Sequence, residues 1–312
     1  MKIETRSEPK AKIQLITGDA FRITTAPHLP KLHQVCVSVA KRGSFKTTAI
    51  SNLLRMYKET GTMDRIILVS PTFHSNIKIL EQLNIKPEDI FDDIDDVSVI
   101  DKIKAICDEE RDAYLRYKKM KANYDRIMKQ IDNGLLPMTG EYDDYLMEYY
   151  DIARNTFRMP EPRYKCYLEG RPGVVAVVFD DILGGKICNS RALVQLTQKH
   201  RHQSPTYDGG AVGVSLYFLI QSFKSQNGIN RSIRNQITSA LIGRTKDDEE
   251  RKQIAQSFAG EISTETFLKV HHEATKDSNH HFLHVDMHPK QPHQRFRKNF
   301  DQYLIVDESS VK

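Results

Sequence analysis

The strongest constraint on the fold is a strand–loop–helix–strand order near the start of the chain. Residues 34–39 (Gln-Val-Cys-Val-Ser-Val) are rich in β-branched side chains, which predicts a strand. Apolar residues recur at helical spacing in 47–59, and residues 65–70 predict a second strand that stops at Pro71. Such a βαβ unit requires parallel strands and a right-handed crossover. The sequence therefore predicts an α/β fold with a mostly parallel central sheet.

Two later apolar runs are typical of buried strands in the same sheet. Residues 173–179 are almost continuously apolar, which suits a parallel strand that is covered on both faces, and residues 212–220 have the same character. Shorter strands are expected at 240–242 and 281–285. Helices are expected at 190–200, 247–259 and 263–274.

A long charged segment interrupts these strands. Residues 99–133 and 141–158 both have helical patterns, and Gly134, Pro137 and Gly140 separate them. The sequence thus predicts an inserted helical hairpin within residues 92–160. The other predicted divisions are a lead-in at 1–33, the main domain at 34–290 and a basic C-terminal tail at 291–312.

The loop after the first strand resembles a phosphate-binding loop. In such a loop, backbone N–H groups and the helix N-terminus surround phosphates. Lys46 would reach the β- and γ-phosphates, and Thr47 would offer a hydroxyl to Mg²⁺. The candidate ATP-binding residues are Ala40, Lys41, Arg42, Gly43, Ser44, Phe45, Lys46, Thr47 and Thr48.

This loop departs from the usual pattern G-x-x-x-x-G-K-[ST] at both glycines, which are replaced by Ala40 and Phe45. A glycine beside the lysine lets the backbone adopt unusual dihedrals and approach phosphate closely. Phe45 is therefore expected to restrict the backbone and to add bulk. On the loop alone, an ATP site and an ordinary strand-to-helix turn both remain open.

Polar residues follow the two long apolar runs. The first run ends in Asp180 and Asp181, of which Asp180 would hold Mg²⁺ through water and Asp181 would polarise the attacking water. Gln221 follows the second run, where it could sense hydrolysis. Each of these residues alone is also compatible with a simple strand end. Their position downstream of the loop favours a nucleotide site with ATP and Mg²⁺ as cofactors.

The order of these motifs resembles that of the poxvirus-type genome-packaging ATPases of the FtsK/HerA superfamily. The resemblance covers roughly residues 20–290 and includes the pairs Arg201-His202 and Arg234-Asn235. It implies a RecA-like P-loop NTPase fold in which the Gln221 strand lies between the strands of the phosphate loop and of the acidic pair.

The resemblance also implies a function. It indicates ATP hydrolysis coupled to the translocation of double-stranded DNA into viral capsids, by a homo-oligomeric ring. Arg234, or alternatively Arg231, would reach the ATP of a neighbouring subunit. Viral capsid proteins would be partners, and the location would be the virion or the host-cell site of virus assembly. Two alternatives are another helicase-like P-loop ATPase and a degenerate P-loop protein that binds DNA or capsid without hydrolysis.

The net charge of +5 is mild, so the positions of the charged residues say more about possible partners than the total does. The basic stretches 111–129 and 289–299, with Lys224 and Arg231, are candidates for phosphate-backbone contacts, although a solvated surface gives the same pattern.

The remaining composition excludes several classes of protein. Seven of the twelve histidines lie in 271–293, which suits either exposed polar positions or a metal site. The four scattered cysteines form no C-x-x-C pair, so a thiolate zinc site is not expected. The same pattern predicts a reducing, intracellular compartment. No apolar run is long enough to predict a membrane span.

Overall fold

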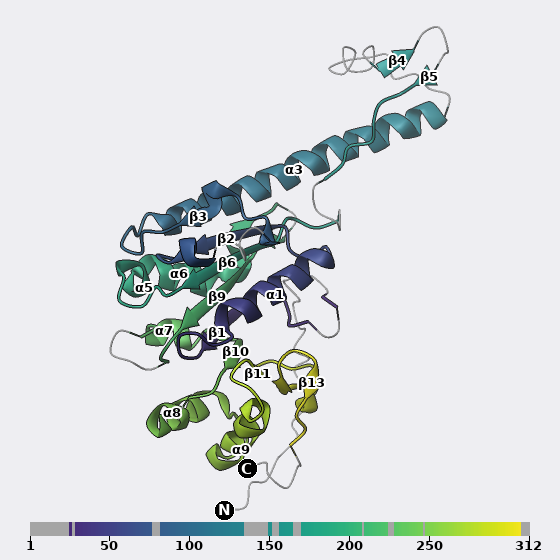
Figure 1. Cartoon of the computed structure of the whole chain (residues 1–312). Coiled ribbons are helices and arrows are strands. Elements are labelled where there is room, and N and C mark those ends of the chain that lie inside the picture. Colours follow the sequence, from purple (N-terminus) through teal and green to yellow (C-terminus); the bar gives the residue numbers. More distant parts are fainter. Residues whose placement is uncertain are drawn as a thin grey trace, which may run out of the picture.

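A computed structural model describes residues 25–26, 29–76, 82–133, 149–151, 156–164, 170–207, 209–223, 228–245 and 247–306. Within these residues, nine strands form one sheet in the order β13-β12-β11-β10-β1-β9-β6-β2-β3 (Figure 1). The strands from β10 to β3 are parallel, and β11, β12 and β13 extend the sheet in the antiparallel sense. This confirms the predicted α/β fold with a mostly parallel sheet.

The strand bounds follow the predictions closely for the long strands. The sheet consists of β1 (Val35–Val39), β2 (Arg65–Val69), β3 (Ile90–Phe91), β6 (Val175–Asp180), β9 (Val214–Ile220), β10 (Ser239–Ile242), β11 (Leu283–Asp286), β12 (Phe296–Lys298) and β13 (Gln302–Tyr303). Every residue of β1, β6, β9 and β10 is buried, which explains why these strands are apolar or small on both faces. Strand β9 pairs with β1 on one side and β6 on the other, as the resemblance implies.

Helices cover both faces of this sheet. Helix α1 (Lys46–Glu59) packs Ile50, Leu53 and Leu54 against one face, in a cluster with Cys36 of β1. On the other face, the neighbouring β1 residues contact a larger core to which most other helices contribute. These are α3 (Val99–Asp132), α5 (Lys186–Asn189), α6 (Arg191–Lys199), α7 (Arg231–Arg234), α8 (Asp248–Phe258) and α9 (Thr264–Thr275). The 3-10 turns are η1 (Phe73–Asn76), η2 (Pro87–Asp89), η3 (His200–His202) and η4 (Pro292–Gln294).

The predicted helical hairpin is confirmed in its first half only. Helix α3 is a continuous helix of 34 residues that projects beyond the sheet as an arm (Figure 1). In the predicted second helix, 141–158, the strands β4 (Tyr150–Asp151) and β5 (Thr156–Phe157) form an antiparallel pair instead. Aromatic and β-branched residues favour such pairing over helix. Residues 134–148 and 152–155 lie outside the described residues.

The predicted basic tail is also wrong for the residues that the structure describes. Strands β12 and β13 extend the sheet beyond β11, so the boundary at residue 290 falls inside the domain. Arg297 is only 4% exposed, and its guanidinium lies 4.7 Å from the ring centroid of Tyr303. A buried arginine of this kind is indistinguishable from a surface charge in the sequence.

A shorter antiparallel pair, β7 (Ser204–Pro205) with β8 (Ala211–Val212), precedes β9.

Residues 1–24 of the predicted lead-in lie outside the described part, whereas Leu29 is buried and Pro30 O accepts a hydrogen bond from the Tyr57 hydroxyl at 2.6 Å. Among the described residues, no helix is both long and apolar enough to cross a lipid bilayer.

Candidate nucleotide site

The candidate site residues lie at the edge of the sheet where the parallel strands end. Val39 of β1 is level with Ile220 of β9, and Asp180 of β6 is level with Leu219. The residues that follow these strands therefore emerge side by side. Ligands of open α/β sheets bind at this edge.

The loop 40–47 connects β1 to α1 with a tight backbone turn. Gly43 has a φ of +73°, a left-handed conformation that strongly favours glycine. The Lys46 ammonium donates hydrogen bonds to Ala40 O at 2.7 Å and Lys41 O at 3.0 Å, so the lysine spans the loop from within. The Ser44 hydroxyl donates to the same Lys41 carbonyl at 2.6 Å. The loop is thus closed around the lysine side chain.

Lys46 carries its charge in a buried position. Its exposed fraction is 7%, and burial lowers the pKa of its ammonium, while Asp181 and Asp180 act in the opposite direction. A desolvated ammonium at the N-terminus of a helix attracts anionic groups more strongly than one in water. The electrostatics of the loop therefore suit phosphate.

The expectation that Phe45 restricts this loop is wrong. Phe45 has φ −75° and ψ −13°, which any residue adopts, and the unusual dihedral of the loop falls on Gly43 instead. The Phe45 ring is directed into the core, where it stacks on Phe282 with 4.7 Å between centroids. Gly243, at the end of β10, leaves room for this ring. The bulk of Phe45 therefore lies in the protein interior.

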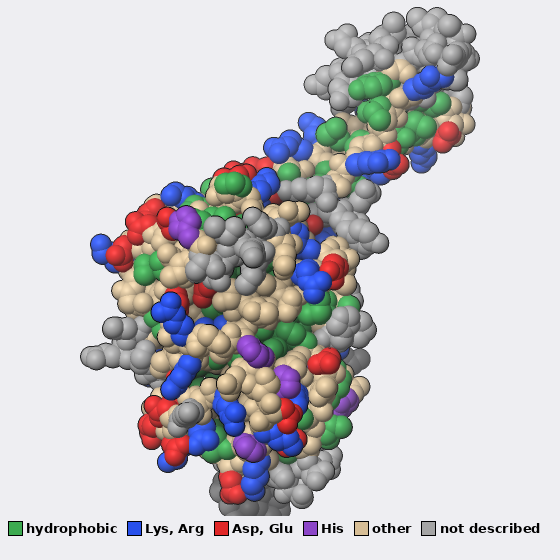
Figure 2. Space-filling model, viewed as in Figure 1, with side chains coloured by type: hydrophobic (Ala, Val, Ile, Leu, Met, Phe, Trp, Pro, Cys, Tyr) green, Lys and Arg blue, Asp and Glu red, His purple; other side chains and the backbone are tan. Residues whose placement is uncertain are grey.

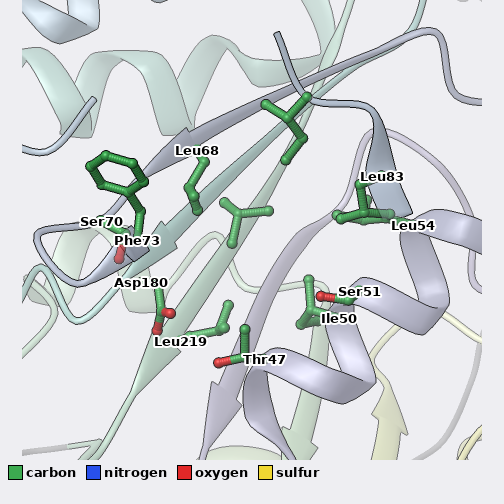
Figure 3. Close-up of a pocket in the computed structure, with 12 residues that line it drawn as sticks. Thr47, Ile50, Ser51, Leu54, Leu68, Ser70, Phe73, Leu83, Asp180 and Leu219 are labelled. Carbon is green, nitrogen blue, oxygen red and sulfur yellow. The ribbon is translucent and has the colours of Figure 1, made fainter. Parts of the chain in front are cut away.

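Asp180 and Thr47 meet across the loop. Both residues line one pocket (Figure 3), and the Thr47 side chain acts on Asp180 to lower the pKa of its carboxyl. Asp180 is 6% exposed, and burial, with the neighbouring Asp181 charge, raises its pKa to about 6 against the smaller opposing effects of Lys46 and Thr47. A hydroxyl and a carboxylate are oxygen donors of the kind Mg²⁺ takes. These two residues therefore fit a shared magnesium ion.

Thr47 and Asp180 would supply two protein oxygens to a magnesium ion. Among the described residues, no group of three or more His, Cys, Asp and Glu side chains could hold a metal by themselves. Mg²⁺ is commonly bound through one or two protein oxygens together with substrate phosphates and water. The pocket that Thr47 and Asp180 line has a volume of about 380 Å³, including space open to solvent, and its other lining residues are mainly apolar. Thr47 and Asp180 lie at one end of it, and Leu54 and Leu83 at the other (Figure 3).

Asp181 and Gln221 form the second pair of the site. The Gln221 amide donates to Asp181 Oδ1 at 3.0 Å, which joins the ends of β9 and β6. Asp181 has a φ of +52°, and its N–H donates to Leu219 O at 3.3 Å. A non-glycine residue in the left-handed region is uncommon. This conformation turns Asp181 out of the strand direction and toward Gln221.

The structure does not bring the candidate arginines to this cluster. Arg234 is half-buried, donates to Ile229 O at 3.0 Å and lies over the Phe223 ring at 5.9 Å, so its recorded contacts are with its own loop. Arg231, at the start of α7, is exposed. Arg201 and His202 are both exposed, and the buried residue of this segment is the preceding His200.

Sequence reasoning missed two residues that shape the site, and it missed several buried histidines elsewhere. His200 lies 2.7 Å from Thr197 O and 3.0 Å from His33 O, ahead of β1 and thus at the edge of the sheet opposite the phosphate loop, and burial lowers its pKa. Gly243 and Phe282, which accommodate Phe45, carry no motif. A glycine at the end of a short strand was the one available signal. Within the histidine-rich segment, His271 and His284 are core residues, bonded to Gly243 O at 2.9 Å and to the Ser239 hydroxyl at 3.1 Å.

A parallel sheet with a strand–loop–helix phosphate loop, an acidic pair two strands away and an inserted strand between them defines a RecA-like P-loop NTPase fold. The structure is similar to the pCW3 conjugation coupling protein TcpA in its monomer form with ATPγS (14% identity, TM-score 0.44, covering 90% of this chain and 64% of TcpA). It is also similar to the genome-packaging NTPase B204 of Sulfolobus turreted icosahedral virus 2 with ATPγS (13% identity, TM-score 0.43, covering 85% and 96%).

A third similar structure is the cytoplasmic domain of the Thermomonospora curvata type VII secretion ATPase EccC (12% identity, TM-score 0.38), of which this chain spans 26%. No protein-family model and no curated protein matches the sequence.

Proposed function

We propose that the protein is an ATP-driven translocase of double-stranded DNA that packages viral genomes. The observation that carries the ATPase part is the meeting of Lys46, Thr47, Asp180 and Asp181 at one edge of the sheet. A buried cation at a helix N-terminus, next to oxygen donors for magnesium, is the arrangement that phosphoryl transfer requires.

Each residue has a distinct role in this proposal. The N–H groups of the loop and the Lys46 ammonium bind the β- and γ-phosphates. Thr47 and Asp180 would hold Mg²⁺, which when bound neutralises charge on the phosphate oxygens. Asp181, held by Gln221 at 3.0 Å, orients the attacking water and accepts its proton. Because Gln221 directly follows β9, loss of the γ-phosphate next to Asp181 would be transmitted to β9 through the Gln221–Asp181 hydrogen bond.

DNA translocation and packaging rest on the motif resemblance. The position of β9 between β1 and β6 agrees with it. The proposal includes a homo-oligomeric ring, in which an arginine of one subunit acts on the ATP of the next. It also includes capsid proteins as partners and the virion or virus assembly site as location.

The discriminating experiment is phosphate release from ATP with and without double-stranded DNA. We expect hydrolysis that requires Mg²⁺ and is stimulated by duplex DNA. Lys46→Ala should abolish it, while Arg55→Ala, an exposed position on the same helix, should not. Nucleotide binding without hydrolysis would indicate a degenerate P-loop protein. Hydrolysis coupled to strand separation would indicate a helicase-like ATPase.

A further inference from the structure

Helix α3 is fixed to the body of the protein by its first part. Arg65, which begins β2, forms ion pairs with Asp89 at 2.8 Å, with Glu109 at 3.2 Å and with Glu110 at 3.5 Å. The Ser204 hydroxyl donates to Asp108 Oδ1 at 2.9 Å. Because these contacts are at the N-terminal end of β2, the rest of α3 extends past that edge of the sheet. The arm therefore projects opposite to the nucleotide loop (Figure 1).

One side of the arm is covered by the returning chain. Tyr114 and Tyr117 are buried, and Tyr164 stacks on Tyr117 with 5.2 Å between centroids. The Tyr164 hydroxyl accepts a hydrogen bond from Gly173 N at 3.1 Å, which ties this layer to the residues before β6. The arm is thus held in a fixed direction by its inner side, and its outer side faces solvent.

The outer side of the arm carries a line of basic residues. Arg116, Lys119, Arg126 and Lys129 are all exposed, and separations of three, seven and three residues place them on one face of the helix. We call these four residues the arm stripe. At 1.5 Å per residue the arm stripe is about 20 Å long. Figure 2 shows Lys and Arg side chains along the arm.

Charge is segregated along this helix. Near the body this face mixes both signs, because Lys104 pairs with Asp101 and Arg111 pairs with Asp108 and Asp112. Beyond Asp112 the charged residues on this face are all basic. Lys119, within the arm stripe, has no acidic residue three or four positions away in the sequence. Lys121, on another face, pairs with Asp125 at 2.8 Å and Glu161 at 2.6 Å. A helix face that only serves solubility usually mixes both signs.

We propose that the arm stripe binds the phosphate backbone of double-stranded DNA. This inference rests on the proposed function and adds the surface through which DNA is held. One DNA strand carries a phosphate about every 3.4 Å, so about 20 Å of exposed cations spans roughly six phosphates. Guanidinium and ammonium groups contact phosphates without reading bases, which suits a protein that moves along any sequence.

The test compares two variants of the full-length protein with the same change in net charge. The arm variant replaces Arg116, Lys119, Arg126 and Lys129 by Gln. The control variant replaces Lys102, Lys104, Lys252 and Lys269, which are exposed or half-exposed on α3, α8 and α9, by Gln. The probe is a fluorescent 30-base-pair duplex of mixed sequence, titrated between 50 and 200 mM salt.

We expect the arm variant to bind the duplex at least about tenfold more weakly than wild type at 100 mM salt. The slope of log affinity against log salt should become shallower by about 0.9 for each lost phosphate contact. The control variant should remain close to wild type, and DNA-independent ATP hydrolysis should be equal in all three proteins.

Two outcomes would overturn the inference in distinguishable ways. If the arm and control variants bind duplex DNA equally well, DNA is held elsewhere and the proposed function stands. If wild type binds no DNA at any of these salt concentrations, both the inference and the proposed translocase fail. Circular dichroism of the variants verifies that α3 is intact, since all four side chains of the arm stripe point to solvent.

Discussion

The ring of Phe45 lies where a side chain at position 243 would be: a Cβ atom on Gly243 would be 2.3 Å from Phe45 Cε1 and 2.7 Å from Ala40 Cβ. Phe45 and Gly243 are therefore a complementary pair. Phe45 takes the place of the usual loop glycine, and the glycine that makes this possible stands at the end of β10. The phosphate loop is consequently packed against the neighbouring strand.

Gly243→Ala should destabilise the protein by about 1–3 kcal/mol, because the added methyl group overpacks a filled space. Phe45 and Ala40 must shift to relieve the contact, so affinity for an ATP analogue should also fall. Urea unfolding and nucleotide titration measure the two effects. In the double variant Phe45→Leu/Gly243→Ala, a large part of the Gly243→Ala penalty should disappear. If the losses of unfolding free energy in the two single variants simply add up in the double variant, Phe45 and Gly243 are not a complementary pair.

Asp180→Asn should stabilise the protein at neutral pH in the absence of nucleotide and Mg²⁺. The pKa of Asp180 is about 6 in the folded protein against 3.8 for the ordinary carboxyl. The folded state therefore binds more protons between these values, and wild-type stability falls as pH rises from about 4 to 6. The full pKa difference corresponds to about 3 kcal/mol. We expect a gain of about 1–2 kcal/mol, because the substitution also removes a charge that favours Lys46.

Urea unfolding between pH 4.5 and 8 measures this prediction. The advantage of Asp180→Asn should increase up to about pH 6, remain level above it and shrink toward zero near pH 4. Asp301→Asn is the control, because Asp301 is an exposed carboxyl in the turn between β12 and β13, away from Asp180. An advantage that is independent of pH would show that ionisation of Asp180 is not its cause.

Gln221→Ala should lower the ATP turnover rate by about 10- to 100-fold while changing nucleotide affinity little. The substitution removes the amide that donates to Asp181 Oδ1, so the proposed base loses its fixed orientation. Steady-state hydrolysis and analogue binding separate the two quantities. Gln236→Ala, a half-exposed glutamine beyond α7, is the control. If Gln221→Ala weakened nucleotide binding but left the turnover rate unchanged, Gln221 would not have a positioning role.

Arg231 and Arg234 should differ in a subunit-mixing experiment. Arg234 is bound to Ile229 O and Phe223 of its own chain, so Arg234→Ala should mainly reduce stability. Arg231 is exposed and free of such contacts in the described structure, which makes it the better candidate to reach a neighbour. Mixing Arg231→Ala with Lys46→Ala subunits should restore part of the activity. If activity recovers only when Arg234→Ala subunits are mixed with Lys46→Ala subunits, Arg234 is the arginine that reaches the neighbour, as the sequence first suggested.

The long buried strands and the phosphate loop could be predicted because their signals are local. The apolar run before Asp180 can only satisfy its backbone and bury its side chains in the middle of a sheet. The parallel order then places Lys46 and Asp180 at the same edge. The length and position of α3 were equally visible in its helical periodicity.

The features that were missed depend on contacts between distant residues. Arg297 looks like a surface cation, and only its pairing within β12 shows that it is buried. Strand β5 has two residues, too few for any periodicity. The effect of Phe45 could not be judged from the loop, because the residues that accept its ring, Phe282 and Gly243, are about 200 or more positions away in the sequence.

The stacking of Phe45 on Phe282 also affects the order of events during synthesis. Phe45 leaves the ribosome long before Phe282 does, and β2, β6, β9 and β10 are made in between. An emerging chain can form the local βαβ unit early, but its phosphate loop lacks the packing partner of Phe45 until Phe282 is translated. Closure of such distant contacts is slow relative to local folding. A nascent polypeptide should therefore acquire ATP affinity only after Phe282 has been translated.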